Sequence, residues 1–169
     1  MKAAGAILLF IFCAASGMLA ARRLSKRERT LRLCMDFLDA AAAELEYSMA
    51  PLDELLGFIC ASGGLDGLLF PERCLGYMER GTPFPQAFSQ AVYDCREENA
   101  MNEADARLMA SVGGILGAMD PAGQIKLLAG KRELLAQRYA DARDAAVKKG
   151  RLWRSLGVMA GMCAVILTC

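Results

Sequence analysis

Apolar residues recur along most of the chain at the three- and four-residue spacing of a helix, and no segment alternates as a strand does. The pattern is clearest after residue 22, where one apolar stripe is made by Leu31, Met35, Leu38, Ala42 and Leu45. The charged residues of this stretch fall off the stripe, as they do on a helix that buries one face. We therefore predict a first helix that runs to about Ser48.

Prolines, glycines and capping residues mark where further helices begin and end. Proline suits the first turn of a helix, glycine suits its end, and Asn or Asp suits the position just before its start. These signals predict five further helices. The first runs from Pro51 to Gly63–Gly64, and the second runs from Pro71 to Arg80 with Gly81 as its cap. The third begins at Pro83 or Pro85 and carries Phe84, Phe88 and Val92 on its apolar face. The fourth runs from the capping pair Asn102 and Asp105 to about Gly117, and the fifth runs from Asp120–Pro121 to the basic flank near the C-terminus.

The N-terminus carries an uncharged apolar run from Ala3 to Ala21. Its 19 residues would span ~28 Å as a helix, close to the hydrocarbon thickness of a bilayer. Six basic residues follow within 22–32, and such flanks stay in the cytoplasm. We predict a transmembrane helix over 1–21 with its N-terminus outside. Cleavage of a signal peptide near Ser16, which would leave a secreted helical protein, is the alternative.

A second apolar run covers 156–169 and is also preceded by basic residues, in this case Lys148, Lys149, Arg151 and Arg154. Its 14 residues would make ~21 Å of helix, which is short for a full span. Gly157 and Gly161 form a GxxxG pair, which permits close helix packing in lipid. We predict a C-terminal membrane segment that either spans the bilayer or dips into it.

These observations together predict the fold class and the domains. The chain should be all-α, an antiparallel bundle of about six helices with an apolar membrane helix at each end. The predicted domains are a transmembrane helix over 1–21, a cytoplasmic helical bundle over 22–155 and a membrane segment over 156–169. Both basic flanks place the same bundle in the cytoplasm.

Charge is segregated along the chain although the net charge is only +1. Residues 33–147 carry nine Lys and Arg against eighteen Asp and Glu, whereas both ends are basic. A nucleic-acid-binding protein would show a basic face on its folded domain, so the acidic middle excludes that class. Basic clusters beside apolar runs favour a lipid membrane as a partner.

Residue content also argues against catalysis. The chain has no histidine, no Gly-rich loop that ends in Gly-Lys-Ser or Gly-Lys-Thr, and seven cysteines without CxxC spacing. We expect no enzyme activity, cofactor, metal, nucleotide or small-molecule substrate, and we interpret all seven cysteines as small buried residues in a reducing compartment. The rival hypothesis of a small membrane enzyme that uses Glu46 or Asp120 lacks a nucleophile motif and a metal site.

Four stretches, in this order and spacing, resemble the stage III sporulation protein AB family over nearly the whole chain. They are GMLAARRLSKRERTLR at 17–32, LEYSMAPLDELL at 45–56, GTPFPQAF at 81–88 and VGGILGAMDPAGQ at 112–124. The second is similar to the family's Glu-x-Tyr-x-x-x-Pro-Leu pattern, although Glu46 and Tyr47 are adjacent here. The fourth is similar to a Gly-x-x-x-Gly-x-x-Asp-x-x-x-Gln signature. Many relatives have Trp where this chain has Phe88.

The resemblance implies a part in endospore formation. It implies membership of a membrane channel complex that links mother cell and forespore, with the main domain on the mother-cell side of the outer forespore membrane. It also implies that the bundle is similar to the helical domains of type II secretion and type IV pilus platform proteins. The implied partners are the cytosolic ATPase of the complex, stage III sporulation protein AA, and the other membrane subunits.

The signature residues allow structural and functional interpretations. Asp120 should cap a helix, and Gln124, one turn on, could bond back toward Asp120 or meet a partner. Gly113 and Gly117 would let two helices approach closely. Candidate partner-binding residues are Glu46, Tyr47, Pro51, Asp120 and Gln124; candidate structural residues are Gly113, Gly117, Gly157 and Gly161.

Overall fold

The computed structural model describes residues 2–47, 51–61, 63–118 and 120–168, and within these ranges it contains helices and no strand. Inside the long first and last helices, the side chains of 2–10, 13–14 and most residues from 151 onward lie outside the described part. The elements are α1 (Lys2–Tyr47), α2 (Leu52–Ala61), α3 (Phe70–Met78), α4 (Phe84–Asp94), α5 (Glu103–Ala110) and α6 (Pro121–Thr168).

The all-helical prediction and the number of helices are confirmed for these ranges. Gly81 lies three residues past the end of α3 with a φ of 87°, the left-handed conformation that suits a glycine at a helix end. α6 continues from the Asp120 start through the predicted second membrane segment as one helix. α1 likewise runs without a break from the first predicted membrane segment to Tyr47.

One helix boundary is wrong in the prediction. The helix expected from Asn102 to about Gly117 ends at Ala110. From Ser111 on, the chain turns through short bonds such as Val112 N–H to Met109 O and Gly113 N–H to Ala110 O. Gly113 and Gly114 lower the helix propensity of this stretch, so tertiary contacts decide its course.

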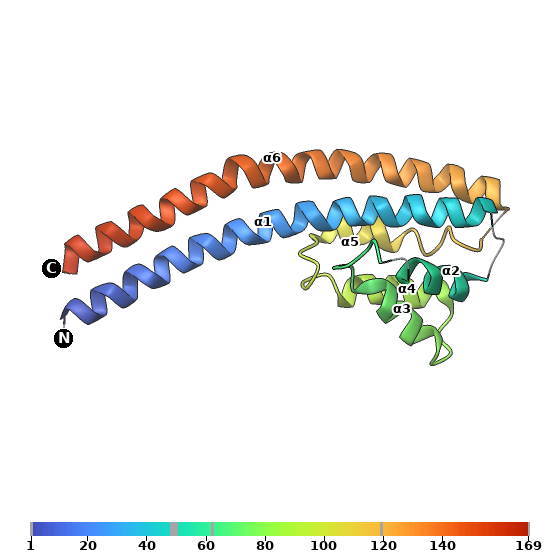
Figure 1. Ribbon diagram of the computed structural model, residues 1–169, viewed down its shortest axis with the longest axis horizontal. Helices are drawn as coiled ribbons and strands as arrows, with labels where there is room; N and C mark the ends of the chain where they lie inside the picture. The colour runs from blue at the N-terminus through green and yellow to red at the C-terminus, as the bar shows by residue number, and fades with distance from the viewer. Residues whose placement is uncertain (1, 48–50, 62, 119, 169) are drawn as a thin grey trace. The chain divides into compact units, whose positions relative to one another are not determined.

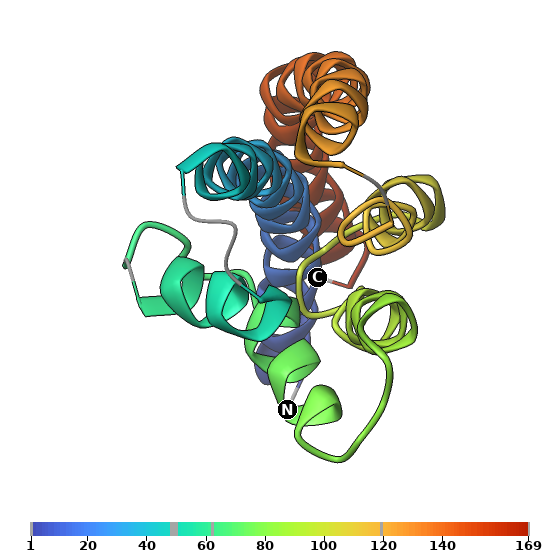
Figure 2. The same cartoon turned by 90° about the vertical axis from the view of Figure 1, so that its right-hand side faces the viewer.

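The chain divides into two compact units. Unit 1 contains 1–28 and 140–169, and unit 2 contains 29–139. Within unit 2, α6 lies on one side of α1, and α2, α3 and α4 lie on the other side (Figures 1 and 2). Unit 2 is a helical bundle, and it holds the candidate site residues from Glu46 to Gln124.

Four phenylalanines form the centre of unit 2. Phe37 from α1 meets Phe70 from α3 edge-on, with ring centroids 5.5 Å apart, and Phe88 from α4 lies 5.9 Å from Phe37. Phe70 and Phe88 form a second edge-on pair at 5.4 Å, and Phe84 extends the group at 5.7 Å from Phe88. Since these rings are buried, their packing holds α1, α3 and α4 together.

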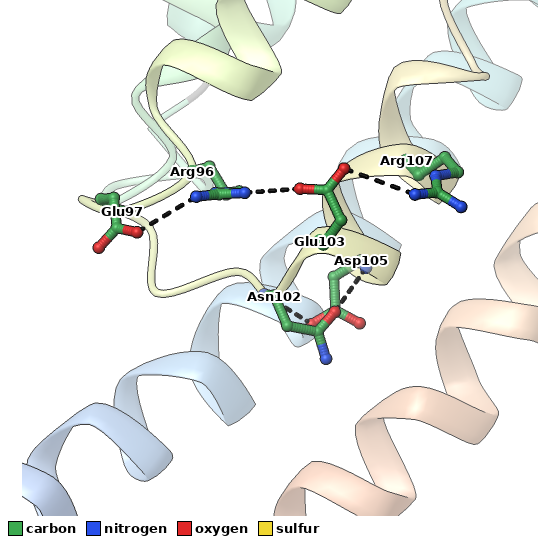
Figure 3. A network of polar contacts seen from close by, with 6 residues as sticks. All are labelled: Arg96, Glu97, Asn102, Glu103, Asp105 and Arg107. Atoms are coloured by element: carbon green, nitrogen blue, oxygen red, sulfur yellow. Dashed lines mark hydrogen bonds and ion pairs between the residues drawn. The ribbon is translucent and has the colours of Figure 1, made fainter.

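A polar network fixes the start of α5 (Figure 3). The Asp105 N–H donates to Asn102 Oδ1 at 2.7 Å, and the Asn102 N–H donates to Asp105 Oδ2 at 3.3 Å. The predicted capping pair is therefore confirmed as a reciprocal capping box. The buried Asp105 carboxylate also accepts from Arg138 of α6 at 3.3 Å, which ties the two helices together.

Unit 1 consists of the remaining parts of α1 and α6, which run side by side (Figure 1). Its buried side includes small residues on both helices, Gly17 and Ala21 on α1 and Ala142 on α6. Small residues let two helices approach closely. The structure does not describe the surroundings of Gly157 and Gly161. The close helix packing predicted for this GxxxG pair therefore stays a prediction.

Among the residues that the structure describes, no helix contains a stretch long and apolar enough to cross a membrane. The predicted membrane segments over 1–21 and 156–169 fall largely on side chains outside that part. The domain boundaries at 21 and 155 therefore stay predictions.

Candidate partner-binding surface

The last turn of α1 presents two of the candidate residues to solvent. Glu46 is exposed, and Tyr47 has 85% of its surface accessible. A tyrosine ring is a large apolar group that is usually covered by other residues. Tyrosine is also enriched in protein interfaces, so an exposed tyrosine is a candidate contact for a partner.

Pro51 is exposed and stands immediately before α2. Its carbonyl accepts the Leu55 N–H at 2.9 Å, so it opens the helix as predicted. Asp53 and Glu54 occupy the exposed side of the first turn, where carboxylates complement the helix dipole. Phe58, one turn after Glu54 on the same face, is 61% exposed.

Asp120 begins α6. Its Oδ2 accepts the Gly123 N–H at 3.0 Å, and its carbonyl accepts the Gln124 N–H at 3.1 Å. The capping role predicted for Asp120 is thus present, and the side chain remains exposed.

The Gln124 side chain points into unit 2 and is only 5% exposed. Its Oε1 accepts the Gly117 N–H at 3.0 Å, so the side chain holds the turn before α6. Gly117 has a φ of 80°, and a Cβ built on it would lie 2.9 Å from Leu52 Cδ1. Gln124 and Gly117 therefore shape the turn that packs against the start of α2, and we assign both a structural role.

The fold brings most of the candidate residues to one end of unit 2, where α1 ends and α6 begins (Figure 1). We call this surface the acidic end; it consists of Glu46, Tyr47, Pro51, Asp53, Glu54 and Asp120. None of its carboxylates makes an ion pair with the described residues. The acidic end thus combines uncompensated negative charge with an exposed tyrosine.

Burial governs the ionisation of the cysteine thiols that the structure describes in unit 2. Burial raises the pKa of Cys34, and it raises the pKa of Cys74 to about 12, so neither thiol ionises near neutral pH. Cys60 and Glu72 line a cleft of about 170 Å³. The pKa of Cys60 is also raised, mainly by burial and to a smaller extent by the negative charge of Glu72. Within the described ranges, no group of His, Cys, Asp and Glu is placed to hold a metal ion.

Reading the sequence alone missed two features near the candidate residues. Phe58 is exposed although it is apolar, and nothing in the sequence indicates that Arg138 contacts Asp105. Arg138 lies 33 positions after Asp105, so only the packing of α5 on α6 brings the two together. Of the cysteines expected to be buried, Cys34, Cys74 and Cys95 are buried and Cys60 is half-exposed. Cys13, Cys163 and Cys169 lie outside the described side chains.

Comparison with protein families identifies the family to which the chain belongs. The model of the family described as stage III sporulation protein AB (spore_III_AB) matches residues 2–169. Neither a curated protein nor a solved structure matches the chain. The similarity to type II secretion platform domains therefore stays a prediction.

Proposed function

Because the chain belongs to the stage III sporulation protein AB family and so has a role in sporulation, we propose that it is a non-enzymatic, membrane-anchored part of the channel complex between mother cell and forespore. The match over 2–169 carries this proposal. In this role the chain presents unit 2 to a cytosolic ATPase of the stage III sporulation protein AA type and joins that ATPase to the membrane subunits.

Exposed apolar side chains in unit 1 support the anchoring. On α1, Phe12 is 73% exposed, Leu19 is 62% exposed and Ile11 is 56% exposed, and on α6, Met159 is 61% exposed. Water-exposed apolar patches of this kind are a liability in a protein that stays in water. Together with the basic residues after position 21, they suit a segment that lies in lipid with unit 2 in the mother-cell cytoplasm.

The acidic end supports docking. Negative charge without internal partners steers association with a basic surface, and an exposed tyrosine supplies contact area that a charge cannot. The chain has no phosphate-binding loop of its own, so ATP hydrolysis would belong to the partner. The helices α1 and α6, which belong to both units, would connect unit 2 to the membrane subunits.

Binding of the full chain, in detergent, to the purified ATPase tests the docking. We expect Glu54→Lys to weaken binding about tenfold or more and Tyr47→Ala to speed dissociation, since both change the acidic end. The matched control is Glu97→Lys, which reverses an exposed charge in the connection between α4 and α5 (Figure 3). This connection lies at the end of unit 2 opposite to the one where α1 ends and α6 begins (Figure 1).

Equal weakening by Glu54→Lys and Glu97→Lys would remove the acidic end from the proposal. No binding by a wild-type chain that is helical by circular dichroism would remove the docking role itself.

A further inference from the structure

Unit 1 contains a cleft of about 340 Å³ where the apolar run of α1 gives way to basic residues. Of the described residues, Met18 and Ala21 line its apolar part, and Arg22 and Ser25 line its polar part. These positions recur at three- and four-residue spacing and so share one helix face. An apolar side and a cationic side therefore meet within ~10 Å along the helix axis.

The polar part of the cleft carries a positive charge from Arg22. Arg22 makes no ion pair with the described residues, and Glu28 is the only acidic residue in 1–32. The Ser25 hydroxyl donates only a long bond, 3.4 Å, to the Ala21 carbonyl. A planar guanidinium beside a hydroxyl matches the oxygens of a phosphate, which accept several such bonds at once.

The apolar part of the cleft indicates which phosphate-containing ligand fits. Met18 is 50% exposed and lines this part together with Ala21. Inorganic phosphate gains nothing from these side chains, whereas an amphiphile buries its first methylenes on them. The headgroup zone of a bilayer leaflet is ~5–8 Å thick, which is comparable with the ~10 Å from Met18 to Ser25.

We propose that this cleft is a binding site for one anionic phospholipid. The phosphate diester accepts from Arg22 and Ser25, and the glycerol and first methylenes lie against Met18 and Ala21. The site rests on the proposed membrane anchoring, and it sets the depth at which α1 leaves the bilayer. A diffuse attraction between the basic stretch and a negative surface acts on every Arg and Lys alike. A specific site instead makes lipid affinity depend on Arg22 more than on its neighbour Arg23.

The test is a titration of the full chain, in a non-ionic detergent, with short-chain phosphatidylglycerol, short-chain phosphatidylcholine and inorganic phosphate, with bound ligand counted by native mass spectrometry. We expect one phosphatidylglycerol per chain, weaker binding of phosphatidylcholine and no binding of inorganic phosphate. Arg22→Gln should lower the phosphatidylglycerol affinity about tenfold, and Ser25→Ala should lower it a few-fold. Arg23→Gln removes the same charge one residue away and should change the affinity less than twofold.

Equal losses in Arg22→Gln and Arg23→Gln would overturn the site in favour of diffuse attraction, and so would several lipids bound without a one-to-one step. Equal binding of inorganic phosphate would overturn the lipid as its ligand. Because the titration is done in detergent, its outcome is independent of cell fractionation: full-length protein in the soluble fraction would overturn the anchoring even if the cleft binds lipid. Circular dichroism of each variant separates loss of binding from loss of helix.

Discussion

Single residues of the family-like signature act through backbone geometry. Gly113 packs directly on the aromatic centre, since a Cβ on it would lie 3.0 Å from both Cβ and Cδ1 of Phe88. Phe88 is fully buried among other rings and has no room to move away. The glycine is therefore required by packing, even though α5 has already ended at Ala110.

Replacing this glycine should destabilise unit 2. We expect Gly113→Ala to lower the free energy of unfolding by about 1–3 kcal/mol, because the added methyl group overpacks the aromatic centre. A thermal melt of the full chain in detergent measures the change. Gly130→Ala is the matched control: that glycine lies inside α6 with open space around it, so alanine should stabilise by about 0.5–1 kcal/mol. A Gly113→Ala variant with the same thermal stability as the wild type would contradict the packing argument.

The buried thiols predict an alkaline loss of stability. The pKa of Cys74 is raised to about 12 by burial, whereas an unfolded thiol ionises near pH 8.5–9. Below that pH both states keep the proton. As the pH rises toward 12 only the unfolded chain releases it, so stability falls across this window.

We expect the denaturation midpoint of the full chain to drop between pH 8 and pH 10.5, and to drop less steeply in Cys74→Ala. Identical slopes in the two proteins would show that Cys74 does not contribute. Over the same range, a thiol reagent followed by peptide mass spectrometry should modify the half-exposed Cys60 before Cys34 or Cys74.

At the scale of elements, two ion pairs attach α6 to its neighbours in unit 2. Arg132 pairs with Asp39 of α1 at 2.5 Å, and Arg138 pairs with Asp105 of α5 at 3.3 Å. The first pair is about half exposed on both sides, so solvent screens it. The second pair involves a fully buried carboxylate that also closes the capping box, so its loss leaves a buried charge without its cation.

We expect Arg138→Gln to destabilise unit 2 by about 1–3 kcal/mol, since the Asp105 carboxylate loses a charged partner. Arg107→Gln is the control, because Arg107 is 73% exposed and pairs at 3.6 Å with Glu103 on its own helix. That change should cost under about 0.5 kcal/mol. Thermal melts of both variants decide the matter, and equal effects would refute the distinction between buried and exposed pairs.

For the whole molecule, the order of charge along the chain suits one topology. Both basic borders adjoin apolar runs, and the acidic stretch between them forms unit 2. In the proposed arrangement unit 2 lies in the cytoplasm and both ends of the chain enter the same membrane. Cys60 is a native reporter of that arrangement because it lies in α2 and is half-exposed.

Labelling of intact and permeabilised cells tests the topology. We expect the full chain to stay in the membrane fraction after an alkaline carbonate wash. A membrane-impermeant maleimide should reach Cys60 only after permeabilisation. Labelling of Cys60 in intact cells would place unit 2 outside, and a shortened N-terminus by mass spectrometry would favour the secreted alternative.

Local interactions are what the sequence by itself determined. Helix starts at Asn102 and Asp120 depend on bonds within three or four residues, and the stripe after residue 22 depends on helix period alone. The absence of histidine and the clustering of charge need no structure to be seen. For this reason the helix number, most helix limits and the family resemblance could be predicted.

Contacts between distant residues were decided only by the tertiary structure. The Gln124 side chain accepts the Gly117 N–H, Arg138 reaches Asp105, and α5 ends early where Gly113 meets Phe88. The acidic end exists because antiparallel α1 and α6 bring Tyr47 and Asp120 to one end of unit 2. Such contacts depend on how whole helices pack, and helical periodicity carries no information about which partner covers a given face.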